Sequence, residues 1–221
     1  MKTPKKTNRL SNLVAIAGLV AGSAFATPTY LPVGAQANVA LATITSGGWT
    51  QCYASTFGTV IGNSGENVLN VCSGDYLMMA GRQTGSTNFL ALAAAMRSDT
   101  IINTGQTSIT HNANGAEWYY SPNWSWGFTQ AGDTVTNNQC DTSNSPLSMC
   151  LHTVNFTGGY RINNIQGLND STDYEKVFFV ADAGNNVPEP GSLALVGLAL
   201  GGLGGLGGLG GLGFFRRRAS R

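Results

Sequence analysis

The sequence predicts a mostly β fold, an antiparallel β-sandwich-like exported domain, followed by a single C-terminal transmembrane helix. Short apolar and aromatic runs alternate with Gly- and Asn-rich turns in the middle of the chain, and they have the length of strands rather than helices. A long uncharged segment lies near each end of the chain. We therefore divide the chain into residues 1–26, an exported domain at 27–186, and residues 187–221, the middle part having the size of one domain.

The expected strands are the short apolar or aromatic runs between turn signals. They lie at residues 60–61, 68–72, 76–80, 118–120, 149–156, 160–162 and 176–181. Gly and Asn cluster at residues 62–65 and 112–115, which suits hairpin turns. Residues 88–97 combine four alanines with larger apolar side chains. This segment could form either a helix or a buried strand, because it is too short for periodicity to decide.

The cysteines all lie in the middle of the chain, and they are Cys52, Cys72, Cys140 and Cys150. An even number in an exported protein favours disulfides, because the compartment is oxidising. Neighbours in sequence suggest Cys52 with Cys72 and Cys140 with Cys150, although four cysteines allow three pairings. A zinc site is the alternative, but no CxxC pair supports it. We expect neither a metal nor a cofactor.

Six aromatic residues lie between residues 118 and 128. Aromatic rings on a loop or a sheet face can stack on sugar rings, which makes glycan binding a hypothesis for this segment. The candidates for stacking are Trp118, Tyr120, Trp124 and Trp126. The alternative is that these rings fill the core, because large aromatic side chains are usually buried.

The sequence contains no complete catalytic motif. Residues 62–66 begin like a nucleophile elbow, but Glu66 stands where the final Gly is needed. His111 and His152 are the histidines of the chain, and no partner motif surrounds either of them. We therefore expect no enzyme. The alternative, a hydrolase acting on matrix polysaccharide, needs one of these histidines in a cleft with a nucleophile or a carboxylate.

The middle of the chain is acidic, although the whole chain has a formal net charge of +1. Residues 27–187 contain four basic side chains, seven aspartates and three glutamates, which gives this region a net charge of −6. Nucleic acid is not an expected partner, because its phosphates need a basic surface.

The amino terminus has the layout of a secretory signal peptide. Four basic residues precede residues 10–25, which carry no charge and are mostly apolar. Ala24 and Ala26 supply the small side chains that signal peptidase requires, so we expect cleavage after Ala26. An uncleaved anchor is the alternative, but the apolar run is shorter than the ~20 residues that a membrane span needs.

The carboxy terminus contains a second uncharged run at residues 191–215. As a helix it would be roughly 37 Å long, enough to cross a hydrocarbon core of about 30 Å. Arg216, Arg217 and Arg218 follow directly and Arg221 ends the chain. Arginines in this position stay in the cytoplasm, so the expected topology places the middle domain outside.

Directly before this run stand Val187, Pro188, Glu189 and Pro190. The two prolines favour an extended backbone, which is the conformation that a protease needs. Together with the apolar helix and the arginine cluster, this motif resembles the PEP-CTERM sorting signal, and the resemblance covers residues 187–221. It implies processing by exosortase, an integral-membrane cysteine enzyme of Gram-negative bacteria that make exopolysaccharide and live in biofilms or flocs.

These features lead to one expectation of function. The protein would be exported across the inner membrane, anchored there transiently, and released to the cell surface or the extracellular matrix. Signal peptidase and exosortase would be its partners during export, and exopolysaccharide a partner afterwards. Its role would be non-catalytic, either glycan-binding or structural. A permanently membrane-anchored adhesin or receptor is the alternative if the arginine tail is retained.

Overall fold

The computed structural model describes residues 27–106, 108–136, 140–142 and 146–184, which belong to one compact unit. The predictions at Ala24, Ala26 and residues 187–221 lie outside these residues, so the signal cleavage site and the sorting motif are not described. In the part of the chain that is described, no helix has the length and the apolar character needed to cross a bilayer.

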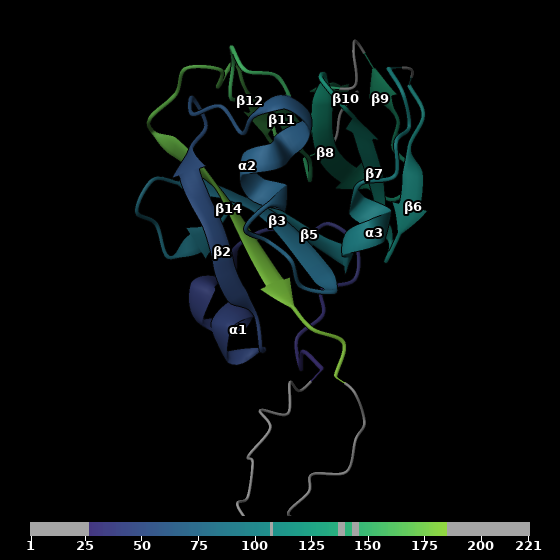
Figure 1. The fold of residues 1–221 in the computed structure, drawn as a ribbon. Helices are drawn as coiled ribbons and strands as arrows, with labels where there is room; N and C mark the ends of the chain where they lie inside the picture. The colour runs from purple at the N-terminus through teal and green to yellow at the C-terminus, as the bar shows by residue number, and fades with distance from the viewer. Residues whose placement is uncertain (1–26, 107, 137–139, 143–145, 185–221) are drawn as a thin grey trace, which may run out of the picture. The chain divides into compact units, whose positions relative to one another are not determined.

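Two antiparallel sheets form most of the domain (Figure 1). The four-stranded sheet has the order β2 (Thr50–Thr56), β14 (Tyr174–Ala181), β3 (Tyr76–Gln83), β5 (Ala91–Met96). The six-stranded sheet has the order β13 (Ile165–Gln166), β12 (Gly159–Ile162), β11 (Met149–His152), β8 (Ser125–Gln130), β7 (Ala116–Ser121), β6 (His111–Ala113). Two short pairs join β1 (Val39–Ala40) to β4 (Asn88–Phe89) and β9 (Val135–Thr136) to β10 (Asp141–Thr142). The prediction of a mostly β domain with antiparallel sheets is confirmed.

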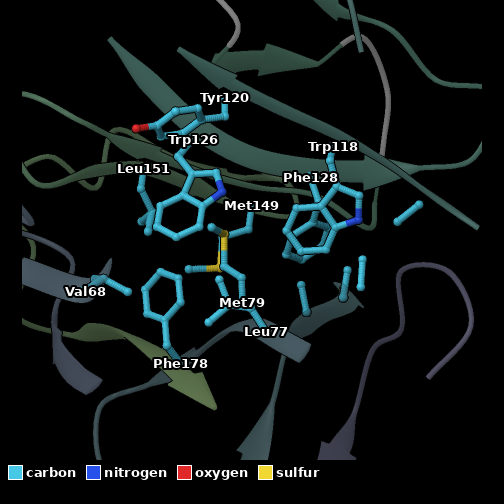
Figure 2. Packing of buried hydrophobic residues seen from close by; sticks show 14 of the residues in the cluster. Val68, Leu77, Met79, Trp118, Tyr120, Trp126, Phe128, Met149, Leu151 and Phe178 are labelled. Atoms are coloured by element: carbon cyan, nitrogen blue, oxygen red, sulfur yellow. The ribbon is translucent and has the colours of Figure 1, made fainter. Parts of the chain in front are cut away.

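The main core lies between the two sheets. Strand alternation turns Leu77, Met79 and Phe178 of the four-stranded sheet toward the other sheet, which contributes rings such as Trp118 and Trp126. Figure 2 shows these side chains interleaved, and the rings of Trp126 and Phe178 have their centroids 5.3 Å apart. Each large apolar side chain buried in this way stabilises the fold by about 1.5–3 kcal/mol.

The four-stranded sheet is also covered on its outer face. Helix α1 (Leu41–Ser46) places Ile44 in a second cluster with Met78 and Phe179 of the sheet. Trp49 joins this cluster, and its indole nitrogen donates a hydrogen bond to the carbonyl of Tyr30 at 2.6 Å. Because both faces of the sheet are buried, its central strands are apolar at consecutive positions rather than at alternate ones.

Residues 88–97 form β4 and β5 and then enter α3 (Arg97–Thr100), so the strand interpretation holds. Small side chains suit β5, because it is packed against apolar groups on both faces. Residues 68–72 are not a strand, since α2 (Glu66–Leu69) and a turn occupy this segment. Residues 60–61 also lie outside the strands, and the strand expected at 149–156 ends at His152.

The turn predicted at residues 112–115 is confirmed, because β6 and β7 form a hairpin there. Asn114 and Gly115 both have positive φ, 48° and 78°, as a tight hairpin turn requires. Residues 62–65 form no hairpin, because they continue through the short 3₁₀ helix η1 (Asn63–Gly65) into α2.

Two of the longer strands, β2 and β8, are missing from the predicted set, and so are the short strands β1, β6, β9, β10 and β13. β2 is mostly polar because it lies at the edge of its sheet, and β8 contains Gly127. A Cβ on Gly127 would lie 2.1 Å from the carbonyl oxygen of Met149 and 2.3 Å from the hydroxyl of Tyr119, so this position has no room for a side chain. Packing on the outer face of the sheet therefore explains a Gly that would otherwise indicate a turn.

The two ends of the described domain lie together. The backbone amide of Gly184 donates a hydrogen bond to the hydroxyl of Thr27 at 3.1 Å. The amide of Ala183 is similarly bound to a carboxylate oxygen of Asp75 at 2.8 Å. Both ends therefore leave the domain from the same side, beyond the last residue of β14 (Figure 1).

Candidate functional site

A pocket of about 720 Å³ opens on the outer face of the six-stranded sheet. It is lined by residues of several segments, namely Asn123, Trp124, Cys140, His152, Val154, Phe156, Thr157, Tyr160, Asn169 and Asp170. These residues combine aromatic rings with amide, carboxylate and imidazole groups. Concave sites of this size and mixed character are typical of small-ligand binding.

Turns and strand ends bring these residues together. Trp124 follows the bend at Asn123, whose φ of 61° lets the chain reverse between β7 and β8. The amide of Trp124 closes this turn by donating to the carbonyl of Ser121 at 3.2 Å. His152 ends β11, and Tyr160 lies on β12, its neighbour in the sheet. Asn169 and Asp170 come from the loop that follows β13, and Val154, Phe156 and Thr157 come from the loop between β11 and β12.

The imidazole of His152 lies at the centre of the polar contacts in this pocket. Its Nε2 lies 3.1 Å from Oδ1 of Asn169, and its Nδ1 lies 3.9 Å from Sγ of Cys140. Its ring packs edge-on against Tyr160. Burial lowers the pKa of His152, while hydrogen bonds to Asn169 and to the backbone of Trp124 act in the opposite direction. The imidazole is therefore uncharged at neutral pH.

Three of the four rings proposed for glycan stacking are buried in the core. Trp118, Tyr120 and Trp126 have only 1%, 7% and 0% of their surface exposed, so no sugar ring can reach them. The reason is strand alternation, because these residues of the β7–β8 hairpin point toward the other sheet. Trp124 is different, because it lies in the turn between these strands and lines the pocket.

Aromatic surface at the pocket comes instead from residues that the sequence did not single out. Tyr160 is half-buried in the pocket wall, and Phe156 has 84% of its surface exposed at the pocket. Asn123 and Asn169 add amide groups. No local sequence signal marks these residues as a group, because they come from separate loops and only the fold brings them together.

Both disulfides follow the pairing that sequence proximity suggested. Cys52 is bonded to Cys72, and Cys140 is bonded to Cys150, with a Cα–Cα distance of 5.3 Å in each case. Disulfides of this kind indicate an oxidising, exported environment. Cys140 also lines the pocket, so the second disulfide belongs to the candidate site.

The fragments of hydrolase motifs do not form a nucleophile elbow with a neighbouring base. Ser64 has a positive φ of 58°, but it lies in η1 and not between a strand and a helix as a nucleophile elbow requires. His111 lies on the edge strand β6 opposite Trp118. His152 does line a cleft that also contains Asp170, but its hydrogen bond goes to the amide of Asn169. Among the described residues, no His, Cys, Asp and Glu side chains are grouped closely enough to hold a metal ion.

A buried lysine lies at the edge of the core between the sheets. Lys176 is fully buried, and its ammonium donates hydrogen bonds to the carbonyls of Thr56 and Phe57, at 2.7 and 3.0 Å, and to that of Thr59. Burial lowers the pKa of Lys176 to about 7. The lysine holds the loop after β2, whose Phe57 ring packs against Gly159 of β12.

Comparison with protein-family models, curated proteins and solved structures finds no match to this chain.

Proposed function

We propose that this chain is an exported protein of the cell surface or extracellular matrix, without catalytic activity, that binds a glycan in the pocket beside Trp124. The observation that supports this proposal is the combination of rings and polar groups in one hollow. Trp124, Phe156 and Tyr160 offer apolar faces to a sugar ring, while Asn123 and Asn169 offer amide donors and acceptors to its hydroxyls.

The charges of the pocket favour a neutral glycan. Of the described residues that line it, Asp170 carries a fixed charge, and the lowered pKa of His152 leaves that ring uncharged at neutral pH. The whole middle region is acidic as well. A uronic acid or sulfated polysaccharide would be repelled, whereas a neutral one meets hydrogen-bonding groups without a charge conflict.

The position of the pocket suits a protein that presents a binding site to its surroundings. Asp170 precedes β14, and Gly184 follows its other end. This strand has eight residues, so it spans about 25 Å. The pocket therefore opens far from the side at which both ends of the described domain leave. A chain held at its carboxy terminus, as the PEP-CTERM resemblance implies, would keep this pocket accessible.

Affinity electrophoresis tests the binding proposal. The purified protein would migrate through gels that contain dextran, xylan or laminarin, which are neutral, and through a gel that contains acidic alginate. We expect retardation by at least one neutral polysaccharide and none by alginate. Trp124→Ala should weaken the affinity about tenfold, which corresponds to the ~1.4 kcal/mol of one lost ring contact. Trp124→Phe is the matched control, because it keeps a ring at the same place. Unchanged migration of the wild-type protein in every gel would refute the proposal.

Intact mass of the protein from the medium and membrane fractions of its host tests the sorting proposal. We expect a released species that begins near Thr27 and ends near residues 188–190. Two disulfides should place its mass about 4 Da below the reduced value. A species that retains residues 191–221 and occurs only in the membrane would contradict exosortase processing and favour a permanently anchored adhesin.

A further inference from the structure

Three side chains from separate segments meet at the wall of the pocket. Cys140 follows β9, His152 ends β11, and Asn169 lies in the loop after β13. The sulfur of Cys140 lies 3.9 Å from Nδ1 of the imidazole, and the side-chain carbonyl of Asn169 lies 3.1 Å from Nε2. The two ring nitrogens therefore face two different groups, a sulfur on one side and an amide on the other.

This arrangement orients the ring as a base toward the sulfur. The carbonyl oxygen of Asn169 can only accept a hydrogen bond, so the contact keeps a proton on Nε2 of His152. Nδ1 is then the nitrogen that can take up a proton, and it lies on the side of Cys140. The contact of the ring with the backbone of Trp124 also favours the protonated imidazole. A thiol, an imidazole and an amide connected in this order form the arrangement that activates cysteine nucleophiles, because the imidazole takes the thiol proton and stabilises the thiolate.

In the structure this sulfur is oxidised, since Cys140 is bonded to Cys150. The chemistry open to it in this state is exchange with an incoming thiolate. The other disulfide has different surroundings. Cys72 is fully buried in the core, and Cys52 lies on β2 in the four-stranded sheet, whereas both histidines belong to the six-stranded sheet. Cys52 is half-buried, whereas Cys140 is 7% exposed and Cys150 is fully buried. What distinguishes Cys140–Cys150 is therefore the pocket and the neighbouring base beside Cys140.

We propose that the Cys140–Cys150 disulfide is redox-active and oxidises a dithiol that enters the pocket, with His152 and Asn169 stabilising the Cys140 thiolate. The first thiolate of the dithiol attacks Sγ of Cys140 and forms a mixed disulfide. The bond to Cys150 breaks, and Cys150 leaves as a thiolate that takes up the proton released by the first thiol.

The second step releases Cys140 from the mixed disulfide. The second thiol of the dithiol gives its proton to Nδ1 of His152. Its sulfur then attacks the first sulfur of the same dithiol, which is bonded to Cys140 in the mixed disulfide. This releases Cys140 as a thiolate beside the imidazolium. Two electrons pass from the dithiol to the protein, the dithiol becomes a disulfide, and its two protons end on Cys150 and His152. Because the reduced state is stabilised, the disulfide should be a better oxidant than an ordinary structural one.

Redox titration of the purified full-length protein tests this proposal, with Cys52–Cys72 as the internal control. The protein would be equilibrated with graded ratios of reduced to oxidised dithiothreitol, and free thiols would be trapped with iodoacetamide and assigned by peptide mass spectrometry. We expect half-reduction of Cys140–Cys150 at a ratio at least tenfold lower than that of Cys52–Cys72. Reduction of the two pairs together, or of Cys52–Cys72 first, would overturn the proposal.

The rate of alkylation as a function of pH tests the role of the imidazole. In the reduced protein, Cys140 should react with a midpoint at least one pH unit below the ~8.5 of a free cysteine. His152→Ala should return this midpoint toward the free value, and His111→Ala should leave it unchanged. Asn169→Ala supplies the same test if the first variant does not fold. A midpoint at or above the free value in the wild-type protein would also overturn the proposal.

The proposal does not depend on glycan binding, and the two can fail separately. Trp124→Ala should weaken the affinity for polysaccharide about tenfold and leave the redox midpoint of Cys140–Cys150 within twofold of the wild-type ratio. His152→Ala should raise the dithiothreitol ratio needed for half-reduction of Cys140–Cys150 at least threefold. Mere loss of packing beside this disulfide would act in the opposite direction, because it would make the disulfide easier to reduce.

Discussion

Replacing Lys176 with Met removes the buried ammonium while keeping a flexible apolar side chain in its place. In the folded protein the pKa of this lysine is about 7, because the side chain is buried. In the unfolded chain its pKa is about 10.4. Between these values the unfolded state holds the proton and the folded state has released it. The free energy of unfolding of the wild-type protein should therefore rise as the pH rises through this window.

The size of the effect follows from the two pKa values. Linkage with a folded pKa of about 7 gives a gain of about 2 kcal/mol in the free energy of unfolding between pH 7 and pH 9. Below pH 7 both states are protonated, and this contribution becomes constant. Lys176→Met should lose the dependence altogether. Lys176→Arg is the matched control, since guanidinium keeps its charge across the range and should give an equally flat contribution.

Urea denaturation at pH 6, 7, 8 and 9, followed by tryptophan fluorescence, measures this difference. Trp118 and Trp126 are buried in the core, so their emission reports unfolding. Groups that titrate in both proteins cancel when the two pH profiles are subtracted. Burial lowers the pKa of His152 below its ordinary value of about 6.5, so its titration touches only the pH 6 point, where the Lys176 contribution is already nearly constant. Parallel profiles for wild type and Lys176→Met would refute the reasoning, because they would mean that the three carbonyls keep the ammonium charged despite its burial.

Two further predictions concern the backbone. Asn114→Ala should destabilise the domain by about 2–3 kcal/mol, because its amide donates to the carbonyls of Pro32 and Ala94 at 2.7 and 2.8 Å and its φ is positive. Glycine tolerates this φ, so Asn114→Gly should recover the stability lost to backbone strain but not the stability lost with the two hydrogen bonds. Equal urea midpoints for the two variants would contradict a contribution of the positive φ. Gly127→Ala should cost about 3 kcal/mol or prevent folding, since the new methyl would collide with the carbonyl of Met149. An unchanged melting temperature would show that the two strands can separate there.

Much of the local structure could be read from the sequence. The aromatic run at residues 118–120 predicted a strand where β7 lies, and the Asn-Gly pair at Asn114 predicted the hairpin before it. The disulfide pairing followed from short separations, 20 residues for Cys52–Cys72 and 10 for Cys140–Cys150. These features depend on neighbours along the chain, and strand period and turn chemistry are local properties.

Short apolar runs that suit both a helix and a strand gave ambiguous or wrong predictions. Residues 88–97 resembled a helix because a strand buried on both faces has no polar alternation. Residues 68–72 resembled a strand but belong to α2 and the turn after it, where Val68, Leu69 and Cys72 pack in the core and Val71 is exposed. In both cases the partner surface decided the structure, and that surface comes from distant parts of the chain.

The candidate site depended most on tertiary structure. The sequence by itself determined that the chain carries a cluster of aromatic residues and two histidines, but not which of them reach solvent. Folding buried Trp118 and Trp126, left Trp124 at a pocket, and placed His152 between Cys140 and Asn169. The members of this site are 12 and 17 residues apart along the chain. Contacts over such separations are set by sheet pairing and loop packing, so no local pattern records them.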